Sequence, residues 1–558
     1  MKKYVCSILT VLCITFGFGA FAACEGNEPP EYVILETPTG VRMEDFWILT
    51  WDEVEDAEVY VVSWGNGETY ETKKNRLNMS FLELEETYTV SIYAKGGIER
   101  DGMLFLDSYA KEIVCTMPEA SDGLIYTLIE DGAAYEVSAG ETFSSDTLIL
   151  PTYHEDGLPI LRIAKRAFQE NELISAIRFP QKLESIGRLA FTKTNIDEAV
   201  FPISLQLIEH GAFGNCENLL QIQNLPKTVE ERAFATTAIQ ELVIDERTEY
   251  IGEKAFAGCD FLSTVIMPTE SPDFGAHVFN NSLWEKKQPK GFIYFGKTLY
   301  RHKGDFPNNT HLDLGELPID KVIDKAFSDC KGLTSVKIPA NVQFGTWVFY
   351  SCEDLTTVQF AQGVTHIPDR TFYDCTNLAN IEFSDELTEI GKGAFECVAR
   401  SLSFWGKALT LILPKDLIKI GDGAFDATFF SDIVFPEKNI ALGRIFRHSS
   451  QLRSISIPDN VVSLDGTFYS CANMRWIVLP KDIKVLSADT FEGTRIEKIF
   501  IRGTQEECLQ WLAENADTME AYIAERQITV YAYSEDPPTE DGNYWHYDID
   551  GVTPIAWE

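Results

Sequence analysis

The chain has 558 residues, with 86 Asp and Glu against 47 Lys and Arg, which gives a formal charge of −39. Because 45% of the residues are hydrophobic and 12% are aromatic, the chain can bury a substantial core, which excludes a disordered acidic polymer. The acid excess also argues against nucleic acid and anionic lipid as partners, since phosphate binding needs a basic footprint.

The first predicted element is an export signal. A basic head at residues 1–3 precedes an apolar run over residues 4–22, the order found in secretory signal peptides. No comparable apolar run follows, so we expect no other segment to span a membrane. The signal peptide is predicted to cover residues 1–23.

The end of the signal carries a candidate lipid anchor. Phe21-Ala22-Ala23-Cys24 resembles the lipobox of bacterial lipoproteins, which implies that Cys24 is diacylated. Two acyl chains give stable anchoring, so residues 24–29 would tether the protein at the cell surface, with the membrane contacted through the anchor only. The alternative is full secretion after ordinary cleavage behind Ala22.

Residues 30–117 alternate short apolar strands with turns, which predicts a β-sandwich. Several positions resemble the core markers of a fibronectin type III domain, namely Trp51, Ala57, Tyr60, Tyr88 and Ala94. Such a domain is usually a spacer or contact module. Residues 118–122 are predicted to be a linker.

An internal repeat organises residues 123–502. Phe recurs fourteen times, and successive gaps are 21 to 23 residues apart from two longer gaps of 48 and 30 residues. These positions are Phe168, Phe191, Phe213, Phe234, Phe256, Phe279, Phe327, Phe349, Phe372, Phe395, Phe425, Phe446, Phe468 and Phe491. A fixed period in the low twenties predicts a solenoid with one unit per repeat.

Other positions repeat in register with Phe. Ala precedes it in eight of the fourteen repeats, Ile-Gly pairs lie upstream of several, and Cys follows three residues later in six. An alternating strand ending in Pro comes about six residues after Phe, as in Leu333-Thr-Ser-Val-Lys-Ile-Pro339. This pattern resembles the BspA-like leucine-rich repeats of bacterial surface proteins. It implies a β-rich solenoid of about fourteen coils, two of them longer than the rest.

Each coil is predicted to supply one short strand. Val336 and Ile338 would point inward and Lys337 outward, and Pro339 would end the strand because it lacks an N–H. The six repeat Cys, at positions 216, 259, 330, 352, 375 and 471, are predicted to be buried free thiols, since their spacing follows the coils and not a disulfide framework.

The 48-residue gap between Phe279 and Phe327 holds an aromatic and basic insert. It could be a projecting hairpin that contacts a ligand, but the favoured interpretation is an irregular coil whose aromatic side chains pack inward. The candidate residues are Trp284, Lys286, Lys287, Lys290, Tyr294, Lys297, Tyr300 and Arg301. The 30-residue gap before Phe425, which contains Trp405, predicts a longer loop.

The outward position of several predicted strands is apolar. A solvated face should carry polar residues there, as Lys337 and Gln359 do, and an exposed apolar stripe marks a partner surface. Intrinsic β-propensity with partial cover by neighbours is an equally weighted alternative. The candidate residues are Val200, Val243, Ile266, Ile412, Val434, Trp476, Val478 and Phe500.

Residues 503–558 are predicted to form a small α+β cap. Thr504 and Glu507 have the spacing of a capping box, followed by a helix that would carry Leu509, Trp511 and Leu512. A strand from Ile528 to Tyr533 and the aromatic tail Tyr544-Trp545-His546-Tyr547 would complete the cap.

The sequence offers no catalytic constellation. It contains no His-Glu-x-x-His, Gly-x-Ser-x-Gly, phosphate-binding Gly loop or Cys-x-x-Cys motif. We therefore predict a protein that is not an enzyme, with no catalytic residues, no metal site and no cofactor.

These features predict a bacterial cell-surface lipoprotein whose repeats form a binding rod. Its partner would be an extracellular protein or glycan, and the family resemblance implies adhesion to host matrix proteins. The alternatives are an accessory part of a glycan-active surface enzyme system and a passive envelope spacer without a specific ligand.

Overall fold

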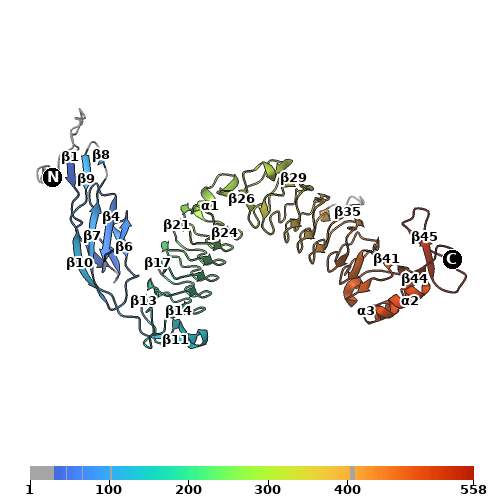
Figure 1. Cartoon of the computed structure of the whole chain (residues 1–558), viewed down its shortest axis with the longest axis horizontal. Helices are drawn as coiled ribbons and strands as arrows, with labels where there is room; N and C mark the ends of the chain where they lie inside the picture. The colour runs from blue at the N-terminus through green and yellow to red at the C-terminus, as the bar shows by residue number, and fades with distance from the viewer. Residues whose placement is uncertain are drawn as a thin grey trace, which may run out of the picture. The chain divides into compact units, whose positions relative to one another are not determined.

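The structure is a computed structural model that describes residues 31–44, 47–65, 67–97, 99–100, 103–401 and 409–557 (Figure 1). The predicted signal peptide, Cys24, the whole of the tether and Trp405 lie outside the described residues. The chain divides into two compact units. The first comprises residues 1–248 and 255–266, and the second comprises residues 249–254 and 267–558.

The first unit begins with a β-sandwich, as predicted. Its strands form three sheets in the orders β1-β9-β8, β10-β7-β4-β5 and β2-β3-β6. Trp51 and Tyr60 are buried in its core, with ring centroids 5.3 Å apart. The strands are β1 (Glu31–Ile34), β2 (Arg42–Glu44), β3 (Ile48–Thr50), β4 (Val59–Trp64), β5 (Glu68–Thr72), β6 (Arg76–Asn78), β7 (Thr87–Lys95), β8 (Glu99–Arg100), β9 (Met103–Leu106) and β10 (Lys111–Thr116).

The sandwich shares its core with the first coils of the repeat array. Ile149 and Ala176 pack against the sandwich core. The guanidinium of the fully buried Arg178 donates to the carbonyl oxygens of Leu82, at 2.5 Å, and Leu150, at 3.0 Å. Burial lowers the pKa of Arg178 to about 10. The buried guanidinium of Arg178 thus donates hydrogen bonds to the sandwich and to the coils, and these bonds hold the two parts of this unit together.

The coils of the first unit carry parallel strands in two rows. One row runs β12-β14-β16-β18-β20, and the other contains the pairs β13–β15, β17–β19 and β21–β23. The elements are β11 (Leu124–Ile129), a 3-10 turn (Glu130–Gly132), β12 (Ala134–Ala139), β13 (Thr147–Ile149), β14 (Ile160–Ile163), β15 (Ala176–Arg178), β16 (Ser185–Ile186), β17 (Glu198–Val200), β18 (Leu207–Ile208), β19 (Gln221–Gln223), β20 (Thr228–Val229), β21 (Glu241–Val243) and β23 (Thr264–Ile266).

The second unit continues the same pattern of coils and ends in two helices and three further strands. Its repeat strands are β22 (Tyr250–Ile251), β24 (Asp273–Phe274), β27 (Thr310–Asp313), β28 (Lys321–Val322), β29 (Leu333–Ile338), β30 (Gln343–Phe344), β31 (Thr357–Phe360), β32 (His366–Ile367), β33 (Asn380–Glu382), β34 (Glu389–Ile390), β35 (Thr410–Ile412), β36 (Lys419–Ile420), β37 (Asp432–Val434), β38 (Ile440–Leu442), β39 (Ser454–Ser456), β40 (Val461–Leu464), β41 (Trp476–Pro480), β42 (Lys484–Val485) and β43 (Lys498–Arg502). Short 3-10 turns lie at Leu314–Glu316 and Ala488–Phe491.

The solenoid prediction is confirmed, but most coils contribute two strands and not one. Val336 and Ile338 are buried and Lys337 is exposed, as the alternation of β29 predicts. The second strand is only two or three residues long in most coils and includes the Ile of the repeated Ile-Gly pairs, as in β34 and β36. Strands this short leave no period-2 pattern in the sequence.

Within each unit the repeated Phe side chains stack into a ladder. In the second unit Phe349, Phe372 and Phe395 have centroid separations of 5.2 and 5.3 Å and nearly parallel rings. In the first unit Phe213 and Phe234 stack at 5.3 Å in the same way. Each ring therefore buries its faces against the neighbouring coils, which explains why the position tolerates little change across the array.

The residue three positions after most of the ladder Phe residues occupies a second buried row. The Cys352 and Cys375 thiols donate to the carbonyl oxygens of Phe327 and Phe349 in the preceding coils, each at 3.0 Å. All nine described Cys are free thiols, and the six at the repeat position are buried, as predicted. Other coils place Thr or Ser in this row, including Thr194, Thr237, Thr428, Ser449 and Thr494.

These thiols should make the folded state sensitive to alkaline pH. Burial raises the pKa of Cys471 from 9.0 to about 12, so the unfolded chain loses this proton first as the pH rises. The free energy of unfolding should therefore fall above pH 9, by at most about 1.4 kcal/mol per pH unit for one such group. Cys471→Thr, which uses a residue native to this row, should flatten that dependence in urea unfolding. An identical pH dependence in both proteins would contradict this account.

The C-terminal cap follows the prediction closely. It contains α2 (Gln505–Glu514), α3 (Ala516–Arg526), β44 (Thr529–Tyr533), β45 (Tyr544–Tyr547) and β46 (Pro554–Ala556). Thr504 and Glu507 form the predicted capping box. Trp511 is buried and its indole N–H donates to the Ile483 carbonyl oxygen at 3.0 Å, whereas Leu509 is exposed, contrary to its expected core position. The last strands extend one sheet in the order β39-β41-β43-β44-β45-β46.

Candidate binding surfaces

Four of the eight predicted stripe residues are exposed. Val243 and Ile266 are adjacent partners in the first unit, with exposed fractions of 49% and 46%. Ile412 and Val434 are adjacent partners in the second unit, at 62% and 49%. Val200 is only half-buried, and its strand partner is Gln223. The exposed residues of the predicted stripe thus occur as two cross-strand pairs, one in each unit.

The prediction of an exposed stripe is wrong for its C-terminal part. Val478 and Phe500 are fully buried, and Trp476 is half-buried beside them. The reason is that β45 returns to this sheet and places Trp545 against them, with the Trp545 and Phe500 rings 5.5 Å apart. Val478 and Phe500 therefore belong to the core of the cap, with Trp476 packed against them, and do not form a partner surface.

The insert between Phe279 and Phe327 forms an additional coil. It contains α1 (Leu283–Lys287) and an antiparallel hairpin of β25 (Gly291–Phe295) and β26 (Thr298–Lys303). His302 takes the place of the ladder Phe, because its N–H donates to the Ala326 carbonyl oxygen at 2.8 Å as Phe327 N–H does to Val348. The 48-residue gap is therefore two coils, with a His in the repeat position between them.

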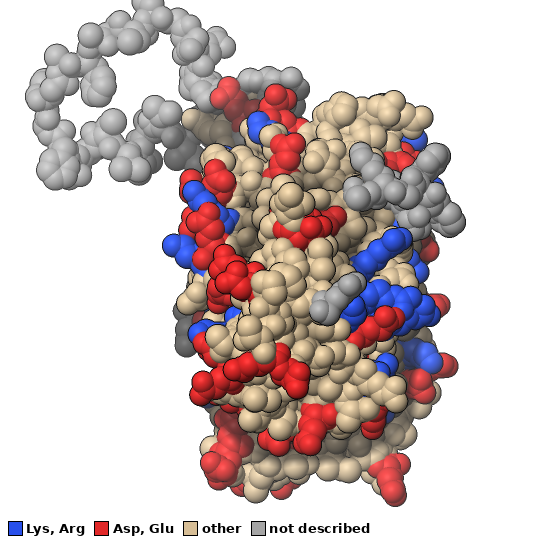
Figure 2. All heavy atoms as spheres, turned by 90° about the vertical axis from the view of Figure 1, so that its right-hand side faces the viewer, with Lys and Arg blue, Asp and Glu red and all other residues tan. Residues whose placement is uncertain are grey.

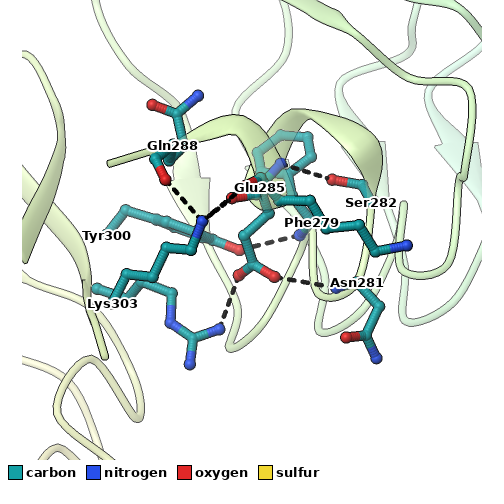
Figure 3. Close-up of polar contacts among 9 residues, drawn as sticks. Phe279, Asn281, Ser282, Glu285, Gln288, Tyr300 and Lys303 are labelled. Atoms are coloured by element: carbon teal, nitrogen blue, oxygen red, sulfur yellow. Dashed lines mark hydrogen bonds and ion pairs between the residues drawn. The ribbon is translucent and has the colours of Figure 1, made fainter. Parts of the chain in front are cut away.

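The aromatic side chains of this insert pack inward, as the favoured interpretation expects. Tyr300 is fully buried, and its hydroxyl oxygen accepts from the Phe279 N–H at 2.9 Å (Figure 3). Trp284 is half-buried and stacks on the buried Phe295 at 5.5 Å. Tyr294 is half-buried on the hairpin.

Part of the basic character of the insert is used internally. Arg301 pairs with the buried carboxylate of Glu285 at 2.7 Å, and the Asn281 N–H donates to the same carboxylate (Figure 3). The Lys303 ammonium donates to three carbonyl oxygens around the end of α1, including that of Gln288 at 2.6 Å. The candidate residues that remain exposed are Lys286, Lys287, Lys290 and Lys297, and Lys297 pairs with Asp320.

A groove that the sequence interpretation missed lies in the second unit. It is an open groove with a volume of about 450 Å³ and has three half-buried aromatic side chains in its wall, Trp347, Tyr350 and Tyr373. The rest of the wall is polar or charged and consists of Lys254, His277, Asn280, Lys325, Ser328 and Asp329.

Two repeat positions next to the ladder Phe build most of this groove. Lys254, His277, Lys325 and Trp347 each lie two residues before a ladder Phe and adopt a left-handed backbone with φ of 55° to 57°. Asn280, Ser328, Tyr350 and Tyr373 each follow a ladder Phe directly. Stacking of the coils brings these two rows together, so alignment on Phe would have revealed the aromatic cluster.

The charges in the groove largely cancel. Glu253 pairs with the ammonium groups of both Lys254, at 2.9 Å, and Lys325, at 3.1 Å. Burial disfavours the charged carboxylate, but the hydrogen bonds from the two lysines outweigh it and hold the pKa of Glu253 below its usual range. Burial, with Arg301 and Lys325 nearby, lowers the pKa of His277 to about 4, so this side chain is neutral at pH 7.

Acidic side chains outnumber basic ones on the face shown in Figure 2. There, Asp and Glu form scattered patches among uncharged residues, and Lys and Arg form smaller groups toward the two sides. Within the described residues, no helix is long and apolar enough to cross a bilayer.

Comparison with protein families gives a match over most of the chain. A model described as the BspA type leucine-rich repeat region, with six copies, matches residues 161–285, 227–302, 306–405 and 400–515. The chain belongs to this family. The matched residues contain the Phe ladder from Phe168 to Phe491, the two exposed apolar pairs and the residues that line the groove. The BspA-type repeats therefore supply the framework on which the pairs and the groove are built.

Comparison with solved structures gives matches to leucine-rich repeat proteins. One from Bacteroides ovatus is 21% identical, with 65% of this chain and 95% of that chain covered and a TM-score of 0.30. The pneumococcal vaccine antigen PcpA is 16% identical, with 71% and 96% covered and a TM-score of 0.30. A leucine-rich cell surface protein from Faecalibacterium prausnitzii is 17% identical, with 72% and 97% covered and a TM-score of 0.23. A search of curated proteins gives no match to this BspA-type chain.

Proposed function

We propose that this protein is an exported, lipid-anchored recognition protein that binds an extracellular protein through its repeat array without chemical turnover. The observation that carries the proposal is the pair of exposed apolar partners Ile412 and Val434, which lie side by side on the strand face. Apolar side chains in direct contact on a solvated face are costly unless a partner covers them, and such patches commonly mark protein interfaces.

The same arrangement occurs in the first unit, where Val243 lies beside Ile266. A repeat array presents equivalent strand positions many times, so one ligand can contact several coils. The family and the absence of a sequence signature for catalysis support binding and not turnover. An anchor at Cys24 would hold this array outside the cell, and equal labelling of wild type and Cys24→Ala by a fatty-acid analogue would contradict the anchor.

The protein-binding proposal can be tested with residues 25–558 and immobilised fibronectin, fibrinogen and laminin as probes. We expect the double variant Ile412→Asp and Val434→Asp to weaken binding roughly tenfold or more, because charges would be buried in the contact. Surface plasmon resonance measures the change.

The matched control is Ile418→Asp. Ile418 is 58% exposed and belongs to the same coil as Ile412, but it lies beside the other row of strands, next to β36. We expect this control to bind as wild type does. Equal binding by the double variant and wild type would reject this surface, and failure of wild type to bind any of the probes would favour a passive spacer.

A further inference from the structure

The aromatic groove of the second unit has the composition of a ligand site. Trp347 and Tyr373 have ring centroids 5.0 Å apart, and Tyr350 and Tyr373 stack at 5.8 Å. The Arg370 guanidinium lies 4.7 Å from the centre of the Trp347 ring. The volume of about 450 Å³ falls within the range of small-molecule sites, which combine aromatic walls with a few convergent polar groups.

The backbone at Trp347 adopts the conformation that this turn has in most coils. Its φ of 57° is in the left-handed region, which a bulky residue rarely adopts. Other coils place Gly at the equivalent position, as at Gly393, Gly423 and Gly466, all with positive φ. Arg166, Leu189, Arg232 and Arg370 also adopt positive φ at this position, so the conformation belongs to the turn of the coil, and Gly at position 347 would fit it without strain.

The electrostatics of the groove select the class of ligand. Lys254 and Lys325 share the carboxylate of Glu253, and Asp329 lines the same groove, so the positive charge facing a ligand is offset. His277 is neutral at pH 7 and offers one donor and one acceptor, and Asn280 and Ser328 offer both kinds of group. This set suits hydroxyl groups better than a carboxylate, a sulfate or a phosphate.

We propose that this groove binds an uncharged saccharide. Sugar rings have apolar C–H faces and a rim of hydroxyl groups, so the C–H faces stack on Trp347 and Tyr373 while the hydroxyls bond to His277, Asn280 and Ser328. The site is separate from the apolar strand pair that carries the proposed protein binding, and neither proposal depends on the other.

The test uses residues 25–558 on an array of neutral and acidic glycans, followed by calorimetry with the best neutral hexasaccharide and with an oligogalacturonate. We expect the neutral probe to bind. Trp347→Gly should weaken its binding roughly tenfold or more, since it removes one stacking surface. Gly is native to this repeat position, so the coil should keep its circular dichroism and melting temperature. Tyr373→Ala removes the stacking surface of a second ring and is an independent test of the same site.

Tyr469→Ala is the matched control, because Tyr469 also follows a ladder Phe and is half-buried but lies outside the groove. It should bind the saccharide as wild type does, and so should the double variant of Ile412 and Val434. The inference is overturned if no neutral glycan binds, if only acidic glycans bind, or if Trp347→Gly and Tyr373→Ala both bind with wild-type affinity.

Discussion

Replacing Phe372 by Ala is expected to lower the free energy of unfolding by about 3–5 kcal/mol. Phe372 is fully buried and stacks on Phe349 and Phe395 with nearly parallel rings, and the Phe360 ring meets it edge-on at 6.0 Å. Loss of the ring leaves a cavity that neighbouring coils cannot fill, because each coil is held in place by both of its neighbours. Urea unfolding followed by circular dichroism measures the change.

Phe261→Ala is the control for this prediction. Phe261 is 61% exposed in the first unit and is not a ladder residue. Its removal should change the free energy of unfolding by less than about 1 kcal/mol. If Phe372→Ala were no more destabilising than Phe261→Ala, the stacked Phe ladder would not be the main source of cohesion between coils.

Replacing Trp545 by Ala is expected to cost about 3–5 kcal/mol and to expose apolar surface on the last coils. Trp545 is fully buried against Phe500 and Val478, and its indole N–H donates to the Ile501 carbonyl oxygen at 2.9 Å. The variant should therefore bind the dye ANS under conditions where wild type does not. Urea unfolding and ANS fluorescence together measure both effects.

The control for Trp545 is Trp557→Ala. Trp557 lies in the same tail, and its indole N–H likewise donates to a carbonyl oxygen, that of Ser534 at 3.0 Å, but its side chain is only half-buried. Trp557→Ala should destabilise the protein less than Trp545→Ala does and should give no increase in ANS fluorescence. A Trp545→Ala protein with wild-type stability and no dye binding would show that the tail does not seal the end of the array.

The period of Phe was sufficient to predict the coils because one large buried side chain must return to the same place in every turn. It did not reveal the second row of strands, whose two-residue length leaves no alternation. Nor did it identify the coil between Phe279 and Phe327, since His302 occupies the ladder position there. A repeat pattern defined by Phe alone therefore passes over that coil.

The candidate surfaces were harder to predict, for physical reasons. Val478 and Phe500 show the same outward pattern as Ile412 and Val434, and they are buried only because residues 544–547 return to cover them. Pairing between segments so far apart leaves no local signal. The groove depends on the stacking of successive coils, and Trp347 and Tyr373 become neighbours only when the sequence is aligned on Phe.

Hydrogen exchange of residues 25–558, alone and with saturating fibronectin, tests the central claim that the repeat array carries the recognition surface. The account predicts slower exchange in the bound state around β35 and β37, with no change in the sandwich or in the C-terminal cap. Protection confined to residues 31–117 or 503–557 would contradict it, because the ligand would then be held by a flanking module and not by the repeats.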